Sequence, residues 1–458
     1  MSKEVRSREA GAESSVPVCA GSTLTCTGRC LLADSSEQRA LPLHSEGRHP
    51  SGAGCERWAV SQSKFREESR GERSSLSIAL ATVGDMTPYQ WFNVVSSLGY
   101  VLFTATTSTV TMLVPAIILL RPVSANLYAR CTSWIFACWW TSCLFITERL
   151  NGVKVRVTGD ALPLNAPLLI MSNHKCNLDW MFLWSSAIRT GSMFHVGVFK
   201  AVAKSEIRVI PIFGWGCKLN GFAYVRRRWS SDASHLTSWI QSQIRRRLDA
   251  NWTLIFPEGT RYTDRNKERS DLSCAKDGLE PMAGEILRPR TKGLALLLRE
   301  SAKGGGYYRK IVDMTIQYTD ADGKPLKGAA LGTRCFGQLA KGKLPVATCH
   351  VHFDVFSAKD VPAGEDEDEV EAWVWKRWRK KADMLEACAS AGRFEGVREW
   401  STSGAAVPLK TQTALRCFFV LQGLVCVGAA CSSTAFLAYV ACAAVGLAVI
   451  AQTDPAWW

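Results

Sequence analysis

The sequence lacks the cysteine pairs that indicate a structural zinc site or a small disulfide scaffold. Its 17 cysteines are spread over 458 residues, and no Cys-x-x-Cys pair occurs among them. His350, His352 and Asp354 alternate along a predicted strand, but no further ligand follows at a suitable spacing. A solvated strand face is therefore the preferred interpretation, and we expect no metal site.

Residues 1–85 lack a sustained hydrophobic period and the apolar core of a secretory signal. They are rich in Ser, Gly, Arg and Glu, a composition typical of a disordered N-terminal extension. Acidic and basic side chains are equally numerous there, which argues against a mitochondrial signal and leaves other targeting signals open. The formal net charge of +14 consequently lies in residues 86–458.

This basic charge favours anionic partners, namely phosphate-bearing ligands, a membrane surface or nucleic acid. The clusters Arg226–Arg228 and Arg245–Arg247 would suit nucleic acid. The second cluster lies on a predicted helix with acidic residues nearby, so a solvated or lipid-facing surface is the better interpretation. No nucleic-acid partner is expected.

Charged residues are also missing from Leu98–Leu120, which is long enough to cross a hydrocarbon core of about 30 Å. A second apolar run, Ser133–Ile146, is shorter and rich in tryptophan. It predicts a partly inserted or interfacial helix that forms a hairpin with the first, and a buried helix of a soluble domain is the alternative. Residues 86–150 are thus predicted to hold N-terminal membrane helices.

A similar region lies near the other end of the chain. Leu415–Ala451 is almost free of charge, with Ser432–Thr434 close to its middle. Two short helices, at about 415–431 and 435–451, would form a membrane hairpin within residues 401–458. One longer, tilted span is the alternative.

Between these regions, residues 151–357 are predicted to form an α/β domain. Alternating or continuous apolar runs predict strands at Val153–Val157, Leu168–Met171, Thr253–Phe256, Ile311–Tyr318 and Val351–Phe356. Asp232–Leu248 has the apolar spacing of an amphipathic helix. Strands interleaved with helices predict a largely parallel sheet flanked by helices. Residues 358–400, with acids at the start of an apolar helical pattern, predict a helical subdomain.

Polar residues follow the second predicted strand. His174 comes after Ser172-Asn173, and Asp179 lies five residues further on. The two can meet if His174 lies on the loop and Asp179 on the first turn of a helix. Asp179 would then orient the imidazole and leave its other nitrogen as a base. A structural His–Asp pair is the alternative.

Two further segments contain polar and basic residues suited to binding a substrate. In Thr253–Arg261 a strand runs into Glu258, Gly259, Thr260 and Arg261, a loop suited to a phosphate or polar headgroup. In Gly221–Trp229 an alternating strand is predicted to direct Arg226 and Arg228 to one face and Arg227 to the other.

Together these segments carry a family resemblance. Asn173-His174-x4-Asp179, then Gly221, Tyr224 and Arg227, then Phe256-Pro-Glu-Gly-Thr-Arg261 resemble the three leading blocks of the glycerophospholipid acyltransferase family. Within it the chain resembles the eukaryotic 1-acyl-glycerol-3-phosphate acyltransferases and their lysophospholipid and lysocardiolipin relatives. Leu287–Gly293 resembles a further segment of that family, and the likeness extends over about residues 90–396. The fourth block normally has a proline on a strand, which Ile311–Gln317 lacks.

The resemblance implies a glycerol-3-phosphate acyltransferase-like fold and transfer of a fatty acyl group from acyl-CoA to a lysophospholipid hydroxyl. His174 would remove the hydroxyl proton and Asp179 would orient His174, with no acyl-enzyme and no cofactor besides the co-substrate acyl-CoA. The residues implied in substrate binding are Asn173, Gly221, Arg227, Glu258, Gly259, Thr260 and Arg261, with Lys204 adding positive charge nearby.

The default acceptor is lysophosphatidic acid, acylated at its free sn-2 hydroxyl. Lysophosphatidylinositol, lysophosphatidylglycerol and lysocardiolipin stay open as acceptors. A different class of function, a lipid-binding membrane scaffold without catalysis, also stays open. The family resemblance implies the endoplasmic reticulum membrane, with the catalytic domain facing the cytosol where acyl-CoA is made.

Overall fold

The computed structural model describes residues 86–163, 166–190, 199–246, 251–327, 331, 335–394, 399–400 and 405–452. The chain divides into two units, Met1–Leu80 and Ala81–Trp458, and all described residues lie in the second. The predicted disordered extension at residues 1–85 lies outside the described residues.

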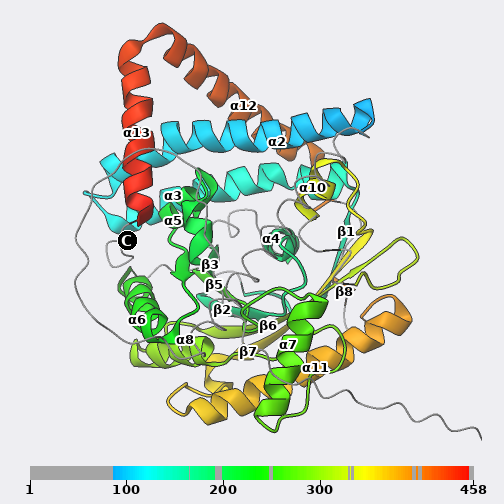
Figure 1. Cartoon of the computed structure of the whole chain (residues 1–458). Helices are drawn as coiled ribbons and strands as arrows, with labels where there is room; N and C mark the ends of the chain where they lie inside the picture. Colours follow the sequence, from blue (N-terminus) through cyan, green and yellow to red (C-terminus); the bar gives the residue numbers. More distant parts are fainter. Residues whose placement is uncertain are drawn as a thin grey trace, which may run out of the picture. The chain divides into compact units, whose positions relative to one another are not determined.

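An eight-stranded sheet forms the centre of this unit (Figure 1). Its order is β4 (Ala223–Val225), β3 (Phe199–Lys204), β5 (Trp252–Ile255), β2 (Leu168–Ser172), β6 (Lys310–Thr319), β7 (Thr348–Ser357), β1 (Lys154–Gly159) and β8 (Glu399–Trp400). The first five strands in this order run parallel, β7 and β1 run the opposite way, and β8 is antiparallel to β1. The predicted fold class, a largely parallel α/β sheet flanked by helices, is confirmed.

Apolar side chains alternate between the two faces of this sheet and fill two cores. On β2, Leu168 and Ile170 belong to one core, and Leu169 and Met171 belong to the other. The first core is covered by α4 (Asp179–Thr190) and the second by α6 (Trp229–Arg246), α8 (Lys292–Lys303) and α11 (Glu367–Ala391). A strand buried on both faces reads as a continuous apolar run, which is why β2 and β5 could be predicted.

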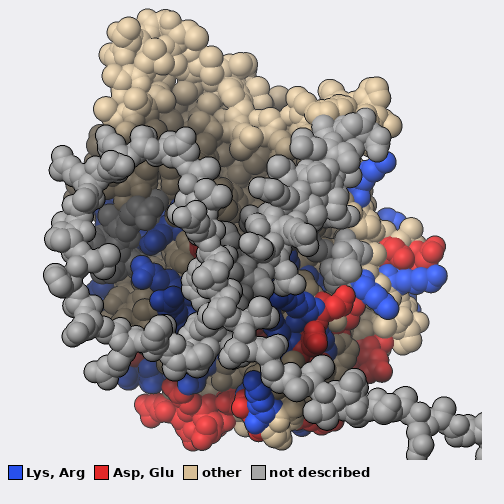
Figure 2. Space-filling view, viewed as in Figure 1, with Lys and Arg blue, Asp and Glu red and all other residues tan. Residues whose placement is uncertain are grey.

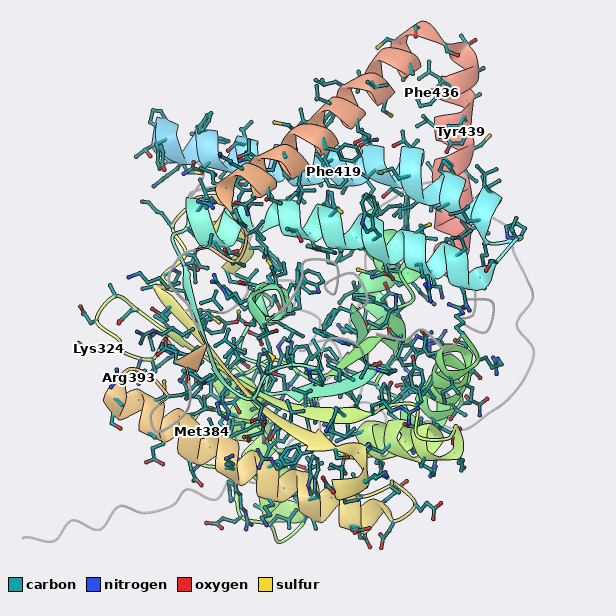
Figure 3. All side chains as sticks on the ribbon, turned by 180° about the vertical axis from the view of Figure 1, so that it is seen from behind. Lys324, Met384, Arg393, Phe419, Phe436 and Tyr439 are labelled. Atoms are coloured by element: carbon teal, nitrogen blue, oxygen red, sulfur yellow. The ribbon has the colours of Figure 1, made fainter. Side chains whose placement is uncertain are left out.

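The helix α11 is tied to the sheet by buried charges. Asp313 on β6 pairs with Arg377, and with Lys381, which is 1% exposed. Figure 3 shows the far end of α11, with Met384 and Arg393 labelled, along the outer side of the sheet. The predicted C-terminal helical subdomain, residues 358–400, thus contributes α11 to a core that it shares with the α/β domain.

The strand face of His350 and His352 was predicted to be solvated, and this prediction is wrong. Both side chains are buried, and each bonds a threonine hydroxyl on a neighbouring strand: His350 bonds Thr319 and His352 bonds Thr158. Phe394, after α11, covers both imidazoles. The sequence around these histidines does not indicate that cover, because Phe394 lies about 40 residues further along the chain.

Two long helices precede the sheet. The first, α2 (Pro88–Ser108), begins at a capping box of Thr87 and Gln90 and continues through π-helical turns to Leu120. The second, α3 (Ala125–Cys143), begins eight residues before the predicted run because the Ser124 side chain caps it. Most side chains from Ser133 to Ile146 are buried in the first core, so α3 matches the alternative of a buried helix better than an interfacial one.

The C-terminal helices are α12 (Leu409–Ser432) and α13 (Thr434–Gln452), which break at Ser433, close to the predicted turn. Phe419 lies where α12 crosses α2 (Figure 3), and a side chain at Gly423 would meet Phe103 of α2. Pro88–Leu120 and Leu409–Ser432 are long and apolar enough to cross a membrane, and Thr434–Val449 is a shorter apolar helix. In the face seen in Figure 2, these upper helices carry almost no charge.

Candidate functional site

The site forms where two neighbouring parallel strands end. β2 and β5 pair in register, so the loop after Ser172 and the loop after Ile255 leave the same edge of the sheet. The backbone N–H of Tyr262 donates to the carbonyl of His174 at 2.7 Å and joins the two loops. Open α/β sheets bind ligands at this carboxyl edge.

His174 and Asp179 meet at this edge. Nδ1 of His174 lies 2.7 Å from Oδ2 of Asp179, and Asp179 is the first residue of α4. The His174 side chain is 19% exposed, whereas that of Asp179 is fully buried. Because the carboxylate accepts from Nδ1–H, Nε2 is the nitrogen left free to accept a proton.

The Asp179 carboxylate is held by donors from two directions. The backbone N–H of Lys175 donates to Oδ2 at 2.7 Å, and that of Cys176 lies 3.1 Å from Oδ1. The Tyr318 hydroxyl on β6 donates to Oδ1 at 2.6 Å. Burial raises the pKa of Tyr318 well above its ordinary value, so this hydroxyl keeps its proton and acts as a donor. Sequence reasoning missed Tyr318.

The His174 ring is also fixed by stacking. Phe256, the first residue after β5, lies with its ring centroid 4.1 Å from that of His174 at an interplanar angle of 19°. Asp179 and Phe256 together restrict the imidazole to one orientation, as a catalytic base requires.

Asn173 uses its amide group within the protein. Its side chain donates to the carbonyl of Ile316 at 3.1 Å and accepts from the N–H of Ile316 at 2.9 Å. The Asn173 amide thus extends the hydrogen bonding between β2 and β6 by one residue. It fixes the backbone directly before His174. The predicted contact of Asn173 with a substrate stays a prediction.

Glu258 is the buried acid of the site. Its side chain is 3% exposed, and neither carboxyl oxygen has a well-aligned hydrogen bond within the described part of the chain. Burial raises its pKa to about 8, although the backbone amides of His174 and Leu287 and the charge of Lys175 favour the ionised form. At neutral pH the protonated form is therefore well populated, and it can donate a hydrogen bond.

Around Glu258 the loop is shaped by a glycine and two arginines. Gly259 has φ +67°, and a Cβ there would lie 3.4 Å from Cδ of Arg290. Arg261 donates to the Oδ1 of Asn177 at 3.1 Å, which joins this loop to the one carrying His174. Thr260 accepts from the Asn266 side chain at 3.3 Å. Arg290 has no acidic partner among the described residues.

The arginine segment after β4 differs from the prediction. The strand ends at Val225, so Arg226–Arg228 do not alternate across a sheet but form a turn in which Arg227 has φ +61°. The Asp232 carboxylate holds this turn by accepting from the N–H groups of Arg226 and Arg228. All three side chains are exposed at the same sheet edge as His174.

Lys204 lies on β3 and Gly221 shortly before β4, and the strand β5 separates both strands from β2 and His174. Lys204 ends β3 and pairs with Glu206 at 2.9 Å at the surface. Gly221 precedes β4, at the opposite edge of the sheet, where its carbonyl accepts from Trp239 and an added Cβ would lie 3.8 Å from Lys200. The predicted substrate contacts of both residues stay predictions.

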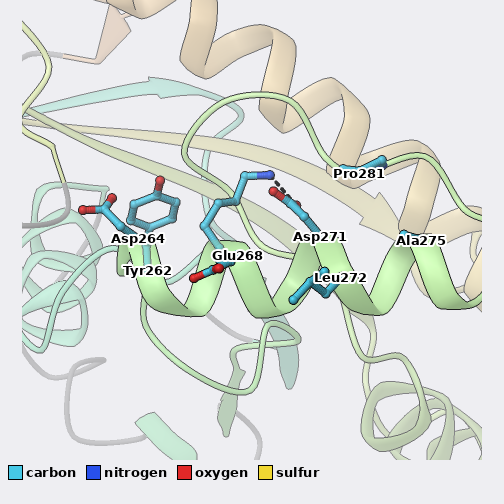
Figure 4. A pocket seen from close by; sticks show the side chains of 8 residues that line it. Tyr262, Asp264, Glu268, Asp271, Leu272, Ala275 and Pro281 are labelled. Atoms are coloured by element: carbon cyan, nitrogen blue, oxygen red, sulfur yellow. Dashed lines mark hydrogen bonds and ion pairs between the residues drawn. The ribbon is translucent and has the colours of Figure 1, made fainter. Parts of the chain in front are cut away.

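A hollow of about 590 Å³ lies beside the Glu258 loop (Figure 4). It is lined by Tyr262 and by α7 (Asp264–Lys276), which contributes Asp264, Glu268 and Asp271. Lys267 also lines the hollow and pairs with Asp271 at 2.6 Å. The acidic lining disfavours phosphate, so this hollow is not the candidate site. Within the described residues, no group of His, Cys, Asp or Glu is placed to hold a metal ion.

Comparisons with known proteins identify the family of this chain. The acyltransferase family model matches residues 154–318, which include His174, Asp179, Glu258 and Tyr318. A probable 1-acyl-sn-glycerol-3-phosphate acyltransferase 5 of Arabidopsis thaliana is 32% identical over 279 residues, covering 60% of this chain and 68% of that protein. Lysocardiolipin acyltransferase 1 of Danio rerio is 31% identical over 264 residues, covering 58% and 63%.

Two further matches extend this set. Lysocardiolipin acyltransferase 1 of Mus musculus is 28% identical over 320 residues, covering 69% of this chain and 78% of that protein. Among solved structures, the 1-acyl-sn-glycerophosphate acyltransferase PlsC of Thermotoga maritima is similar with a TM-score of 0.35 and 16% identity, covering 64% of this chain and 98% of that chain.

Proposed function

The chain belongs to the acyltransferase family that includes 1-acyl-sn-glycerol-3-phosphate and lysocardiolipin acyltransferases, and on that premise we propose that it acylates lysophosphatidic acid. The acyl donor is acyl-CoA, the acceptor group is the free sn-2 hydroxyl, and the products are phosphatidic acid and free CoA. The observation that carries the proposal is the 2.7 Å contact between His174 and Asp179, with Nε2 of His174 left free.

The reaction is a direct transfer. Nε2 of His174 takes the proton of the acceptor hydroxyl while that oxygen attacks the thioester carbonyl carbon. The tetrahedral intermediate collapses with cleavage of the carbon–sulfur bond, and the CoA thiolate leaves with the proton returned by His174. Asp179 stabilises the imidazolium that forms between the two steps, and Tyr318 and the amides of Lys175 and Cys176 keep Asp179 in place.

The arginines at the same edge are the proposed binding groups for the acceptor phosphate. Arg227 and Arg261 lie on the loops that follow β4 and β5. Glu258 in its protonated form offers a donor to the glycerol oxygens beside them. A guanidinium binds a phosphate through two parallel hydrogen bonds, so a dianionic phosphate is the ligand that this set fits best.

Lysocardiolipin is the second candidate acceptor, because two relatives, at 31% and 28% identity, are named lysocardiolipin acyltransferase 1. Lysocardiolipin carries two phosphate diesters, each with a single negative charge, in place of the one phosphate monoester of lysophosphatidic acid. We further propose that the enzyme resides in the endoplasmic reticulum membrane with its α/β domain on the cytosolic side, where acyl-CoA is made. The two apolar helices long enough to span a membrane support a membrane location.

The test is acyl transfer by the detergent-solubilised full chain. Labelled oleoyl-CoA is supplied with lysophosphatidic acid, lysophosphatidylinositol, lysophosphatidylglycerol or lysocardiolipin. We expect label in phosphatidic acid, and a loss of about 10²–10⁴-fold for His174→Ala and Asp179→Asn. His235→Ala, on α6, is the matched control and should keep the activity.

Each other outcome changes a different part of the proposal. Label only in another lipid class would keep His174 as the base and overturn lysophosphatidic acid as the acceptor. Unchanged turnover by folded His174→Ala protein would overturn the mechanism. Absence of transfer to every acceptor by folded protein would favour a lipid-binding scaffold.

A further inference from the structure

An exposed apolar loop follows β3 at the carboxyl edge of the sheet. The run Val209–Phe213, here called the apolar loop, connects a 3-10 helix (Ser205–Val209) to α5 (Phe213–Leu219). Val209 is 54% exposed, Ile210 47% and Phe213 36%. A continuous apolar run that stays open to solvent in a well-packed domain marks a surface that meets another apolar phase.

The apolar loop is held in this exposed form by a tight backbone. Ile212 has φ +66°, a conformation that costs a β-branched residue about 1–3 kcal/mol and persists only where the surroundings enforce it. The N–H of Ile210 donates to the carbonyl of Ile207 at 3.1 Å, and the N–H of Gly214 donates to that of Ile210 at 2.9 Å. A Cβ at Gly214 would lie 2.1 Å from the carbonyl oxygen of Ile207, so only glycine allows this approach. The exposure is therefore built into the fold.

The neighbours of the apolar loop include an exposed aromatic residue and two exposed arginines. β3 and β4 are adjacent parallel strands, with Lys204 opposite Val225, so the loops that follow them lie side by side. The second loop carries Trp229, which is 38% exposed, and Arg226 and Arg228, whose guanidinium groups have no acidic partner among the described residues. Exposed aliphatic and aromatic side chains bordered by arginine are typical of surfaces that lie in the headgroup zone of a bilayer.

The apolar loop also continues the apolar surface of the C-terminal helices. α13 lies against α5 and against the 3-10 helix before the apolar loop. Val445 and Val449 near the end of α13 are 67% and 60% exposed, whereas Leu447 is buried. A bilayer that surrounds α13 would therefore come close to the apolar loop, since α13 packs against the elements on both sides of it.

A chain of aromatic contacts connects the apolar loop to the candidate site. The Phe213 ring lies 6.1 Å from the ring of Trp180 and 6.0 Å from that of Trp140, between centroids. Trp180 directly follows Asp179 on α4. The position of the apolar loop relative to the bilayer thus fixes the position of α4 and of His174.

We propose that the apolar loop and Trp229, bordered by Arg226 and Arg228, dock onto the interfacial zone of an anionic phospholipid bilayer. The apolar side chains enter the headgroup and upper acyl region, and the arginines bind lipid phosphates. The docking itself does not depend on the reaction. Its consequence, that an acceptor reaches His174 without leaving the bilayer, rests on the proposed function.

The direct test measures the surroundings of position 210 in the full chain. An environment-sensitive fluorescent amino acid replaces Ile210, or Leu272 as the matched control, since Leu272 is 58% exposed on α7. The protein is placed in nanodiscs of phosphatidylcholine with or without phosphatidylserine, and spin-labelled lipids act as quenchers. We expect quenching at position 210 at least threefold stronger than at 272, rising with phosphatidylserine and falling in the Arg226→Gln, Arg228→Gln variant.

Equal quenching at both positions would overturn the proposal. So would protection of position 210 in native membranes but not in pure-lipid nanodiscs, because that result would assign the surface to a protein partner. Neither outcome depends on turnover, so a failure of the proposed function would be recognised separately.

A functional test follows from the consequence. Ile210→Glu should lower transfer to a long-chain acceptor in vesicles about tenfold, while transfer to a short-chain acceptor dissolved in water stays unchanged. Leu272→Glu should change neither. Equal losses with both acceptors in Ile210→Glu would assign the loop to the internal structure of the site and overturn docking.

Discussion

The Tyr318 hydroxyl donates a hydrogen bond of 2.6 Å to Oδ1 of Asp179, across 139 residues of sequence. The other carboxylate oxygen lies 2.7 Å from Nδ1 of His174. Tyr318 therefore touches no reacting atom but positions the residue that orients the base. Because α4 begins at Asp179, this bond also fixes the start of that helix against β6.

Tyr318→Phe should lower kcat about tenfold and leave the KM values for acyl-CoA and acceptor unchanged. The variant keeps the buried ring and loses one donor to Asp179, which is equivalent to about 1.4 kcal/mol of transition-state stabilisation. Steady-state kinetics separate the two parameters. Tyr308→Phe is the matched control, because its hydroxyl donates to Thr253 at 2.8 Å within the same domain but away from Asp179. An equal fall in kcat for both variants would mean that Tyr318 stabilises the fold and does not position Asp179.

The sequence allowed the meeting of His174 and Asp179 to be predicted because only a loop and the first turn of a helix separate them. Tyr318 could not be predicted, because its contact depends on β6 lying beside β2, and a lone tyrosine on an apolar strand is equally typical of a core. Gly221 is the opposite case: its sequence block could be recognised, but the residue lies at the edge of the sheet opposite to His174. The sequence thus indicated which loops carry site residues, whereas the order of the strands in the sheet decided which side chains meet.

The same distinction applies to the secondary structure. Continuous apolar runs predicted β2 and β5, because burial on both faces removes every polar position. The alternation of Gly221–Trp229 predicted a strand far longer than Ala223–Val225. Its end is set by Asp232, whose carboxylate captures the next N–H groups and turns the chain away from the sheet.

Asn173→Ala should lower both stability and kcat. The substitution leaves the buried N–H and carbonyl of Ile316 without their partner, at a cost of about 1–3 kcal/mol, and loosens the residue before His174. Thermal unfolding in detergent and steady-state kinetics measure the two effects. Asn151→Ala removes a similar set of side-chain bonds to backbone, far from the site, and should lower stability with kcat retained. A kcat equal to wild type in Asn173→Ala would contradict the positioning role.

Glu258 predicts a dependence of stability on pH. Its pKa is about 8 in the folded protein and near 4.5 when unfolded, so the folded state binds more protons between these values. The stabilising contribution is therefore complete below about pH 4.5 and is lost as pH rises through about 8. Glu258→Gln cannot ionise, so its melting temperature relative to wild type should increase from pH 5 to pH 9.

The slope of this change is at most about 1.4 kcal/mol per pH unit. Thermal unfolding of both proteins at a series of pH values measures it. Glu268→Gln, an exposed glutamate on α7, removes a carboxyl group without burial and should show a difference independent of pH. A constant difference between Glu258→Gln and wild type would contradict the buried, protonated carboxyl.

Gly259→Ala should raise the KM for the acceptor several-fold, whereas Gly278→Ala should not. Both glycines have φ +67°, so an alanine costs each about 1–2 kcal/mol of stability. A Cβ at Gly278 meets nothing within 4 Å, whereas one at Gly259 would lie 3.4 Å from Cδ of Arg290. Gly259 lies in the loop that carries Glu258 and Arg261, so the backbone strain at Gly259 acts on the proposed binding groups. Kinetics with vesicle-borne acceptor, beside thermal unfolding, compare the pair. Matching KM values would mean that the acceptor does not contact this loop, because the backbone strain is the same in both variants.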